Sequence, residues 1–104
     1  MTTVWIPHAK ASQAGKLFLE ALKKFPDDRS LAKSLLNNAV TATKEGYKVY
    51  IADEIKEGKL KEYLAQANKQ LIFFAENMEG YKYEIEVLSS LVEAMAILGL
   101  KVPD

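Results

Sequence analysis

The sequence predicts a single α+β domain in which a four-stranded antiparallel sheet carries its two longer helices on one face. Along the chain, the hydrophobic spacing changes repeatedly between the period of a strand and that of a helix, which indicates a mixed fold. Hydrophobic residues make up 49% and charged residues 27% of the 104 residues, which is typical of a globular protein of one-domain size. No linker, repeat or low-complexity tract interrupts the pattern, so we expect one domain over residues 1–104.

The first third of the chain is expected to form one strand and two helical segments. Residues 3–8 are rich in β-forming side chains, which predicts a strand. Residues 12–25 then space their apolar side chains as a helix does, with Ser12 as the expected cap. Residues 28–38 repeat this helical spacing behind Asp28 and predict a short helical insertion.

A β-hairpin is expected next, because residues 39–43 and 47–55 are rich in β-branched and aromatic side chains. Gly46, third in the intervening loop, fits a three-residue turn that includes a left-handed residue. Pairing Thr43 with Tyr47 divides the hairpin into two faces. One face then carries Ala39, Thr41, Tyr47, Val49 and Ile51, and the opposite face carries Val40, Ala42, Lys48, Tyr50 and Ala52.

The second half is expected to hold the longest helix, the last strand and a C-terminal helix. Residues 60–78 show one continuous apolar stripe at helical spacing. Residues 81–88 alternate between apolar and charged side chains, as in a strand with one polar face. Ser90 and Glu93 form a capping-box pattern that opens a short helix, and Gly99 is a natural end for it.

This order of elements is the βαββαβ string of the ferredoxin-like fold, with a helical insertion and an extra C-terminal helix. In that fold the first and third strands are central, and the second and fourth lie at the edges. Two helices cover only one face of the sheet, so the other face must be polar or covered by a partner. On that face we expect Trp5, Val40, Tyr50 and Ala52 among Lys48, Lys82, Glu84 and Glu86.

Two apolar surfaces predict a homodimer. A Trp and a Tyr on one sheet face form a patch that is costly to leave in water. The C-terminal helix over residues 91–98 is apolar nearly all round, and such a helix needs to be buried on more than one side. A monomer of this size offers little to bury it against, so we expect a second copy of the chain to cover both surfaces.

The chain resembles the dimeric α+β barrel superfamily in three features: the order of its elements, the aromatic residues on its open sheet face, and its apolar last helix. The resemblance covers most of the chain, and residues 5–10, 42–46 and 80–86 are the segments most similar to small members of the superfamily. It implies two ferredoxin-like sheets packed face to face around a shared cavity. The superfamily includes cofactor-independent monooxygenases, isomerases, haem-degrading enzymes and ligand-sensing domains, so the activity stays open.

His8, the only histidine, is a candidate catalytic residue. Near the end of the first strand it could act as a general base or as a ligand to an iron or haem centre. The alternative is a histidine packed under the following helix and hydrogen-bonded to the backbone. One histidine per chain excludes a three-histidine metal site, and the lack of cysteine excludes disulfides and thiolate ligands. We therefore expect no metal and no cofactor.

Glu84 and Glu86 are further candidates, because they point to the same side of one strand. Enclosed beside Lys48 and Tyr50 in a dimer cavity, they form a candidate acid–base pair with shifted pKa values. The alternative is the solvated face of an edge strand, where charges discourage aggregation. Together with Trp5, these four residues are the expected ligand-binding residues, although Trp5 and Tyr50 also suit the core of a dimer interface.

Three functions fit this sequence: small-molecule binding in a barrel cavity, a cofactor-independent oxygenase or isomerase in the same cavity, and a structural or assembly module with a filled barrel. We expect the first, with a second copy of the chain as partner. The balance of 14 basic and 14 acidic residues gives no footprint for nucleic acid or a membrane surface. The N-terminal sequence lacks a signal-peptide pattern, so the expected location is the cytoplasm.

Overall fold

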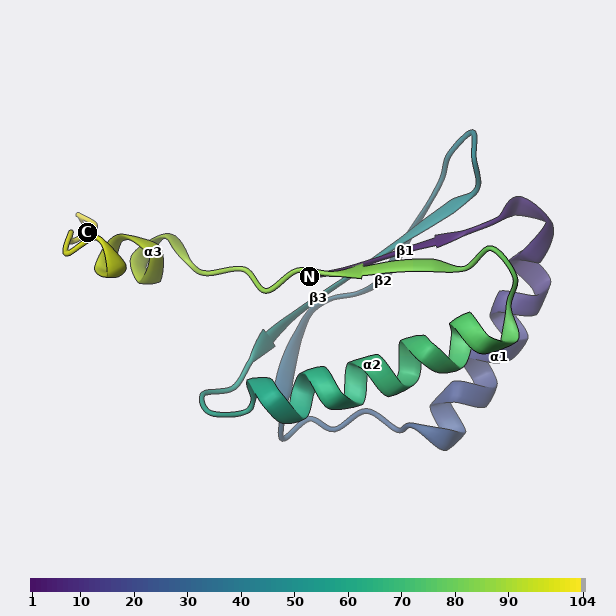
Figure 1. Ribbon diagram of the computed structural model, residues 1–104, viewed down its shortest axis with the longest axis horizontal. Helices are drawn as coiled ribbons and strands as arrows, with labels where there is room; N and C mark the ends of the chain where they lie inside the picture. The colour runs from purple at the N-terminus through teal and green to yellow at the C-terminus, as the bar shows by residue number, and fades with distance from the viewer. Residues whose placement is uncertain (104) are drawn as a thin grey trace.

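The computed structural model describes residues 1–103, and its elements follow a mixed order (Figure 1). The strands are β1 (Thr2–Ile6), β2 (Ala32–Ala42), β3 (Tyr47–Ile55) and β4 (Lys82–Ile85). The helices are α1 (Ala11–Lys24), α2 (Leu60–Asn77) and α3 (Leu91–Ile97), with a short 3-10 turn η1 (His8–Lys10) directly before α1. Figure 1 shows α1 and α2 on one side of the sheet, whereas α3 stands apart at the end of an extended arm.

The sheet is antiparallel throughout, in the order β2-β3-β1-β4. The first and third strands are therefore central and the second and fourth are at the edges, as expected. Val4 of β1 lies opposite Val49 of β3 on one side and opposite Tyr83 of β4 on the other. Directly opposed residues point to the same face of a sheet, so these three side chains form one row beneath the helices. The α+β class is confirmed.

The core lies between this face of the sheet and α2. Phe74 of α2 stacks on Tyr81, with the ring centroids 5.4 Å apart. The apolar stripe predicted for residues 60–78 thus holds α2 over the central strands. The buried centre consists of Val4, Val49 and Leu71, and Ile6, Tyr81, Tyr83 and Ile85 pack against it half-buried.

The predicted helical insertion at residues 28–38 is wrong, because these residues lead into and form much of the long edge strand β2. Asp28, expected to cap a helix, instead accepts hydrogen bonds from the hydroxyl and the backbone N–H of Ser30. These bonds form a turn and hold the pKa of Asp28 below its usual value. From Ala32, opposite Ile55, the strand then pairs with the outer edge of β3, whose backbone groups need partners.

The apolar spacing in this segment looks helical because β2 is irregular. Its register against β3 shifts between Ser34 and Leu36 and again between Leu36 and Ala39. Asn38, inside the second shift, has a left-handed backbone with φ of 52°. Each irregularity of this kind adds a residue that has no partner and breaks the alternation of side chains. A strand interrupted twice no longer shows the period of two by which strands are recognised.

The hairpin is present, but its register differs by one residue from the prediction. Ala42, and not Thr43, lies opposite Tyr47. The N–H of Thr43 donates to the carbonyl of Gly46 over 2.7 Å, and residues 43–46 form the loop between β2 and β3. A slip of one residue turns every side chain of a strand to the other face. Val40 and Ala42 therefore face the helices, and the open face gains Ala39 and Thr41.

The last strand is shorter than predicted, since β4 ends at Ile85 and the expectation extended to residue 88. Beyond it, the backbone of Glu86 still pairs with the first residue of the chain. The N–H of Glu86 donates to the carbonyl of Met1, and the N-terminal ammonium of Met1 donates to the carbonyl of Glu86, both over 2.7 Å. The chain leaves the sheet after this pair.

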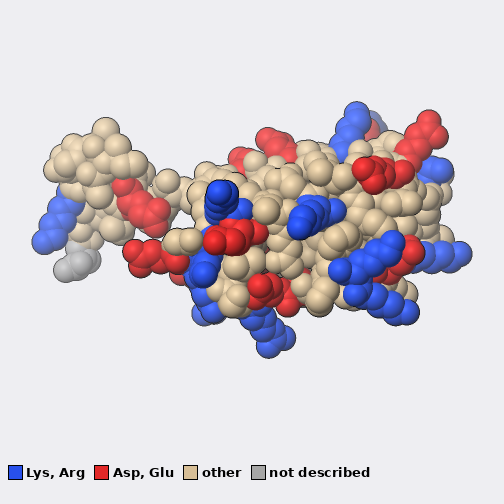
Figure 2. All heavy atoms as spheres, turned by 60° about the horizontal axis from the view of Figure 1, so that its bottom comes forward, with Lys and Arg blue, Asp and Glu red and all other residues tan. Residues whose placement is uncertain are grey.

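The arm that follows ends in α3, whose predicted capping is confirmed. Ser90 Oγ accepts the backbone N–H of Glu93 over 3.1 Å. The helix stands away from the body, and Ile97 is 82% exposed. Figure 2 shows charges of both signs spread over the body, whereas the arm is mostly uncharged. A short apolar helix is not stable alone in water, so α3 requires a covering surface.

Replacing Gly46 by Ala is expected to destabilise the fold by more than about 2 kcal/mol, because its positive φ disfavours any side chain and a Cβ would collide with the carbonyl oxygen of Ile6. Gly15→Ala in α1 is the matched control, with open space around the new methyl group. It should stabilise the protein by about 0.5–1 kcal/mol through the helix propensity of Ala. Urea unfolding followed by circular dichroism measures the free energy of unfolding of both variants, and equal effects would contradict the close approach of Gly46 to the carbonyl of Ile6.

Candidate functional site

The face of the sheet away from α1 and α2 carries two cross-strand rows of side chains. The strand register defines them, because directly opposed residues point to the same face. The first row consists of Lys48, Trp5 and Lys82, and the second consists of Tyr50, Thr3 and Glu84. The structure thus brings together four of the residues proposed from the sequence: Trp5, Lys48, Tyr50 and Glu84.

Lys48 lies between two aromatic rings on this face. Its Nζ is 5.7 Å from the ring centroid of Trp5 and 5.4 Å from that of Tyr50. Both distances are within the range in which an ammonium group is attracted to an aromatic ring. The three side chains are half-buried, so their rings and methylene groups shield the cation partly from water. We refer to Trp5, Lys48 and Tyr50 as the open-face cluster.

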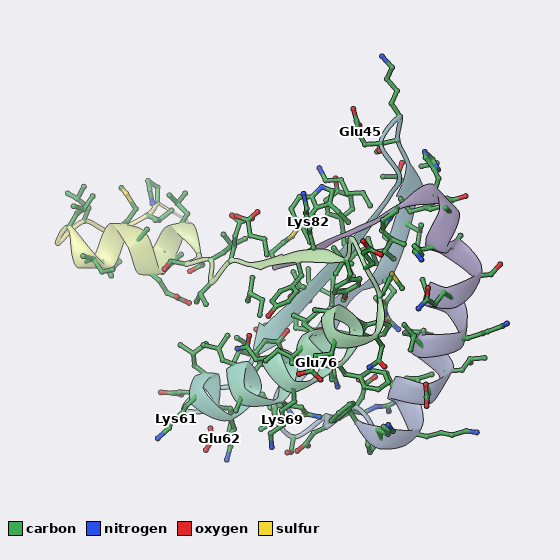
Figure 3. All side chains as sticks on the ribbon, turned by 45° about the vertical axis from the view of Figure 1, so that its right-hand side comes forward. Glu45, Lys61, Glu62, Lys69, Glu76 and Lys82 are labelled. Carbon is green, nitrogen blue, oxygen red and sulfur yellow. The ribbon has the colours of Figure 1, made fainter. Side chains whose placement is uncertain are left out.

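A groove with a volume of about 840 Å³ extends from Trp5 and Lys48 of the open-face cluster toward the hairpin loop, and Tyr50 does not line it. Pro7 and Gly46 line this groove, and so do four charged residues. Figure 3 shows Lys82 on the side of the sheet away from α2 and Glu45 at the tip of the hairpin. The charged lining residues are Glu45, Lys48, Lys82 and Glu84. In a single chain this groove is open, and Glu84 is exposed.

His8 does not belong to this groove. It lies in η1, is exposed, and its Nε2 is 2.8 Å from the carbonyl oxygen of Thr43. Its ring meets that of Tyr47 edge-on, with centroids 5.3 Å apart, and Tyr47 faces the helices. The sequence allowed two roles for His8, a catalytic one and a structural one with a hydrogen bond to the backbone. The observed hydrogen bond fits the structural role, although the side chain is not packed under α1. His8 therefore does not line the groove with Glu84, although its neighbour Pro7 and its hydrogen-bond partner Thr43 do.

Glu86 is also separate from the groove. It follows the end of β4 and is exposed, and it contributes its backbone to the pairing with Met1. The groove is lined by Glu84 but not by Glu86. The paired carboxylates expected from the alternation of residues 81–88 are thus not enclosed together in one chain.

Sequence reasoning missed a polar pair on the opposite face of the sheet. Tyr63 of α2 donates its hydroxyl hydrogen to Asp53 Oδ2 of β3 over 2.6 Å. Burial, and then this hydrogen bond, raises the pKa of Tyr63. Burial, followed by the nearby Tyr83, likewise raises the pKa of Tyr81. Alternation along residues 47–55 could have placed Asp53 beneath the helices, but nothing in the sequence identifies its partner.

Within residues 1–103, no three His, Cys, Asp or Glu side chains are arranged to hold a metal ion. None of the helices in this range has the length and apolar composition needed to cross a membrane. Neither family models, nor curated proteins, nor solved structures give a match to this chain. The open-face cluster and the groove beside it are the features on which a function can be proposed.

A double-mutant cycle tests the contact between Trp5 and Lys48. Trp5→Leu, Lys48→Met and the double variant should show a coupling of about 0.5–1 kcal/mol in the free energy of unfolding, as for a partly exposed cation–π pair. Circular dichroism in urea measures it without relying on tryptophan. The control cycle combines Trp5→Leu with Lys61→Met, because Lys61 lies on the outer side of α2 (Figure 3). The changes in the free energy of unfolding should be additive in this control. Additivity within about 0.3 kcal/mol in the first cycle would exclude the contact.

Proposed function

We propose that this chain is the subunit of a homodimeric, ferredoxin-like barrel that binds a small aromatic anion between two open sheet faces. The observation that carries the proposal is the open-face cluster, in which a lysine sits between two aromatic rings on a sheet face that the chain leaves uncovered. Such a cluster offers stacking surface and positive charge at one place, which is what an aromatic ring with an acidic substituent requires.

The strand order supports the ferredoxin-like part of the proposal. The order β2-β3-β1-β4 puts the first and third strands in the centre, and α1 and α2 are the two connections on one face. A sheet with helices on one face has a second face that must be solvated or covered. Here that second face contains aromatic and aliphatic side chains, which favours its burial against a partner over its exposure to water.

A second copy of the chain is the simplest cover for the open face. Leu36, opposite Ala52, adds an aliphatic side chain that is 40% exposed beside the half-buried Tyr50. Two identical faces related by a two-fold axis bury the same patch on both subunits and close the assembly. Closure of this kind turns the open groove into an enclosed cavity, in which the attraction between Lys48 and an anion is less screened by water.

Binding is favoured over catalysis by the positions of the candidate residues. A cofactor-independent oxygenase or isomerase needs a base beside its bound substrate. Glu84 lies at the groove but is exposed, whereas His8 does not line the groove and its Nε2 is held at the carbonyl of Thr43. The open-face cluster itself supplies recognition of a ring and a charge, so the proposed role is that of a binding or sensing dimer.

Benzoate is a suitable probe of this proposal. Trp5 is the only tryptophan, so its indole N–H gives one separate peak in a ¹H–¹⁵N NMR spectrum. We expect benzoate to shift this peak in a saturable way, benzyl alcohol to shift it more weakly, and benzylammonium to shift it least, because the open-face cluster contains a lysine and no carboxylate. Lys48→Met should raise the dissociation constant for benzoate about tenfold, which corresponds to about 1.4 kcal/mol.

Lys61→Met is the control for this measurement, because Lys61 lies on the outer side of α2 and carries the same charge (Figure 3). It should leave the benzoate titration unchanged. Equal shifts with the anion and the cation, or a titration unaffected by Lys48→Met, would contradict the proposed ligand class.

A further inference from the structure

Within residues 1–103, the exposed apolar helix α3 packs against no other helix or strand. Its side chains Leu91, Val92 and Leu98 are exposed, and so are Val87 and Leu88 in the extended segment before it. α3 carries only one charged residue, Glu93. Seven residues are too few for an isolated helix to persist in water. The arm therefore has the composition of a segment that is buried in the assembled protein.

An apolar groove on the helix-covered side of the sheet is open in the same chain. It lies between the helices and the sheet, is lined by residues of α1, α2, β1, β2 and β3, and has a volume of about 1270 Å³, far more than the water-sized voids that protein interiors contain. Three apolar side chains that point into the space between the two layers stay exposed there: Phe18 is 40%, Leu22 is 44% and Val40 is 62% exposed. On the side of a sheet that helices cover, such residues are normally buried.

The dimensions of the two features are compatible. α1 has 14 residues and is about 21 Å long, so a groove along it accommodates α3, whose 7 residues span about 10 Å. Both signs of charge lie around the groove and at the two ends of α3. The groove is lined by Asp27, Asp28, Arg29 and Lys33, and the arm carries Glu93 and Lys101.

The arm of the same chain is badly placed to fill this groove. It leaves from β4, which is at the opposite edge of the sheet from β2. Figure 1 shows α3 and α1 at opposite ends of the molecule, whose long axis is 49 Å. The five residues 86–90 span about 17 Å when fully extended. The arm of a second copy is not limited by the length of residues 86–90 in this way, because it does not start from the same sheet.

We infer that α3 of one copy packs into this groove of a second copy, against the exposed apolar residues of α1 and β2, and that the second copy returns the same contact. Each chain has one arm and one groove, so a reciprocal exchange closes the assembly as a dimer. This contact lies on the helix side of the sheet and goes beyond the open-face contact of the proposed function. The exposed residues of the groove and of the arm then cover one another.

Disulfide trapping tests this inference, and the natural chain contains no cysteine that would compete. A chain with Leu22→Cys is mixed with a ¹⁵N-labelled chain with Leu98→Cys, and the mixture is oxidised at micromolar concentration. Mass spectrometry then identifies the cross-linked heterodimer. We expect this heterodimer to be the main product. Phe18→Cys mixed with Val92→Cys provides a second pair, so that the result does not depend on one register.

Leu19→Cys in place of Leu22→Cys is the matched control, because Leu19 is exposed on α1 but does not line the groove. Its yield of heterodimer with Leu98→Cys should be at least tenfold lower. Yields no higher than this control for both groove pairs would overturn the inference, as would preferential cross-linking of Leu98→Cys to Leu36→Cys on the open face. The benzoate titration is independent of the arm, so the inference can fail while the proposed function stands.

Discussion

The burial of Val4 against Val49 and Leu71 is the contact on which the other features of this structure depend. Val4 and Val49 occupy the two central strands, directly opposite one another. Because successive side chains of a strand point to opposite faces, fixing these two residues beneath α2 also fixes their neighbours. Trp5 and Lys48 must then lie together on the other face. The position of the candidate site is therefore a consequence of core packing.

Much of the fold could be predicted because the apolar residues of its main elements follow the regular spacing of a helix or a strand. The stripe of residues 60–78 and the alternation around Tyr83 both reflect a single buried face, so the pattern and the structure agree. The prediction failed in β2, where Asn38 and two register shifts break the alternation. The prediction also put Val40 on the wrong face of the sheet. The register of the hairpin depends on the hydrogen bonds between Thr43 and Gly46, and this backbone geometry leaves no pattern in the side chains.

The candidate site was only partly accessible to sequence reasoning, for a related reason. Trp5, Lys48 and Glu84 could be placed on one face by alternation within each strand and by the strand order. His8 could not be placed in this way, since it follows the end of β1 and its orientation depends on the carbonyl of Thr43. Contacts between elements, such as that of Tyr63 with Asp53, depend on how α2 lies over the sheet, and no local period encodes that.

The shape of the chain shows why assembly is central to this account. The radius of gyration is 15.9 Å, whereas a compact domain of this length is expected to have about 13 Å. The difference reflects an arm that leaves the body, while the sheet keeps one open face and one partly filled groove. One layer of helices is too little to cover all of these apolar surfaces at once. The proposed dimer would cover both faces of the sheet with residues of a second copy of the chain.

The most direct measurement of this central claim is the quenching of Trp5 fluorescence by acrylamide as the protein is diluted. Trp5 is the only tryptophan and belongs to the open-face cluster, so its accessibility reports on whether that face is covered. We predict that quenching is weak at micromolar concentration and rises on dilution, with the same midpoint as the dissociation of the dimer in sedimentation velocity. Quenching that stays constant while the dimer dissociates would place Trp5 outside the interface and contradict the account.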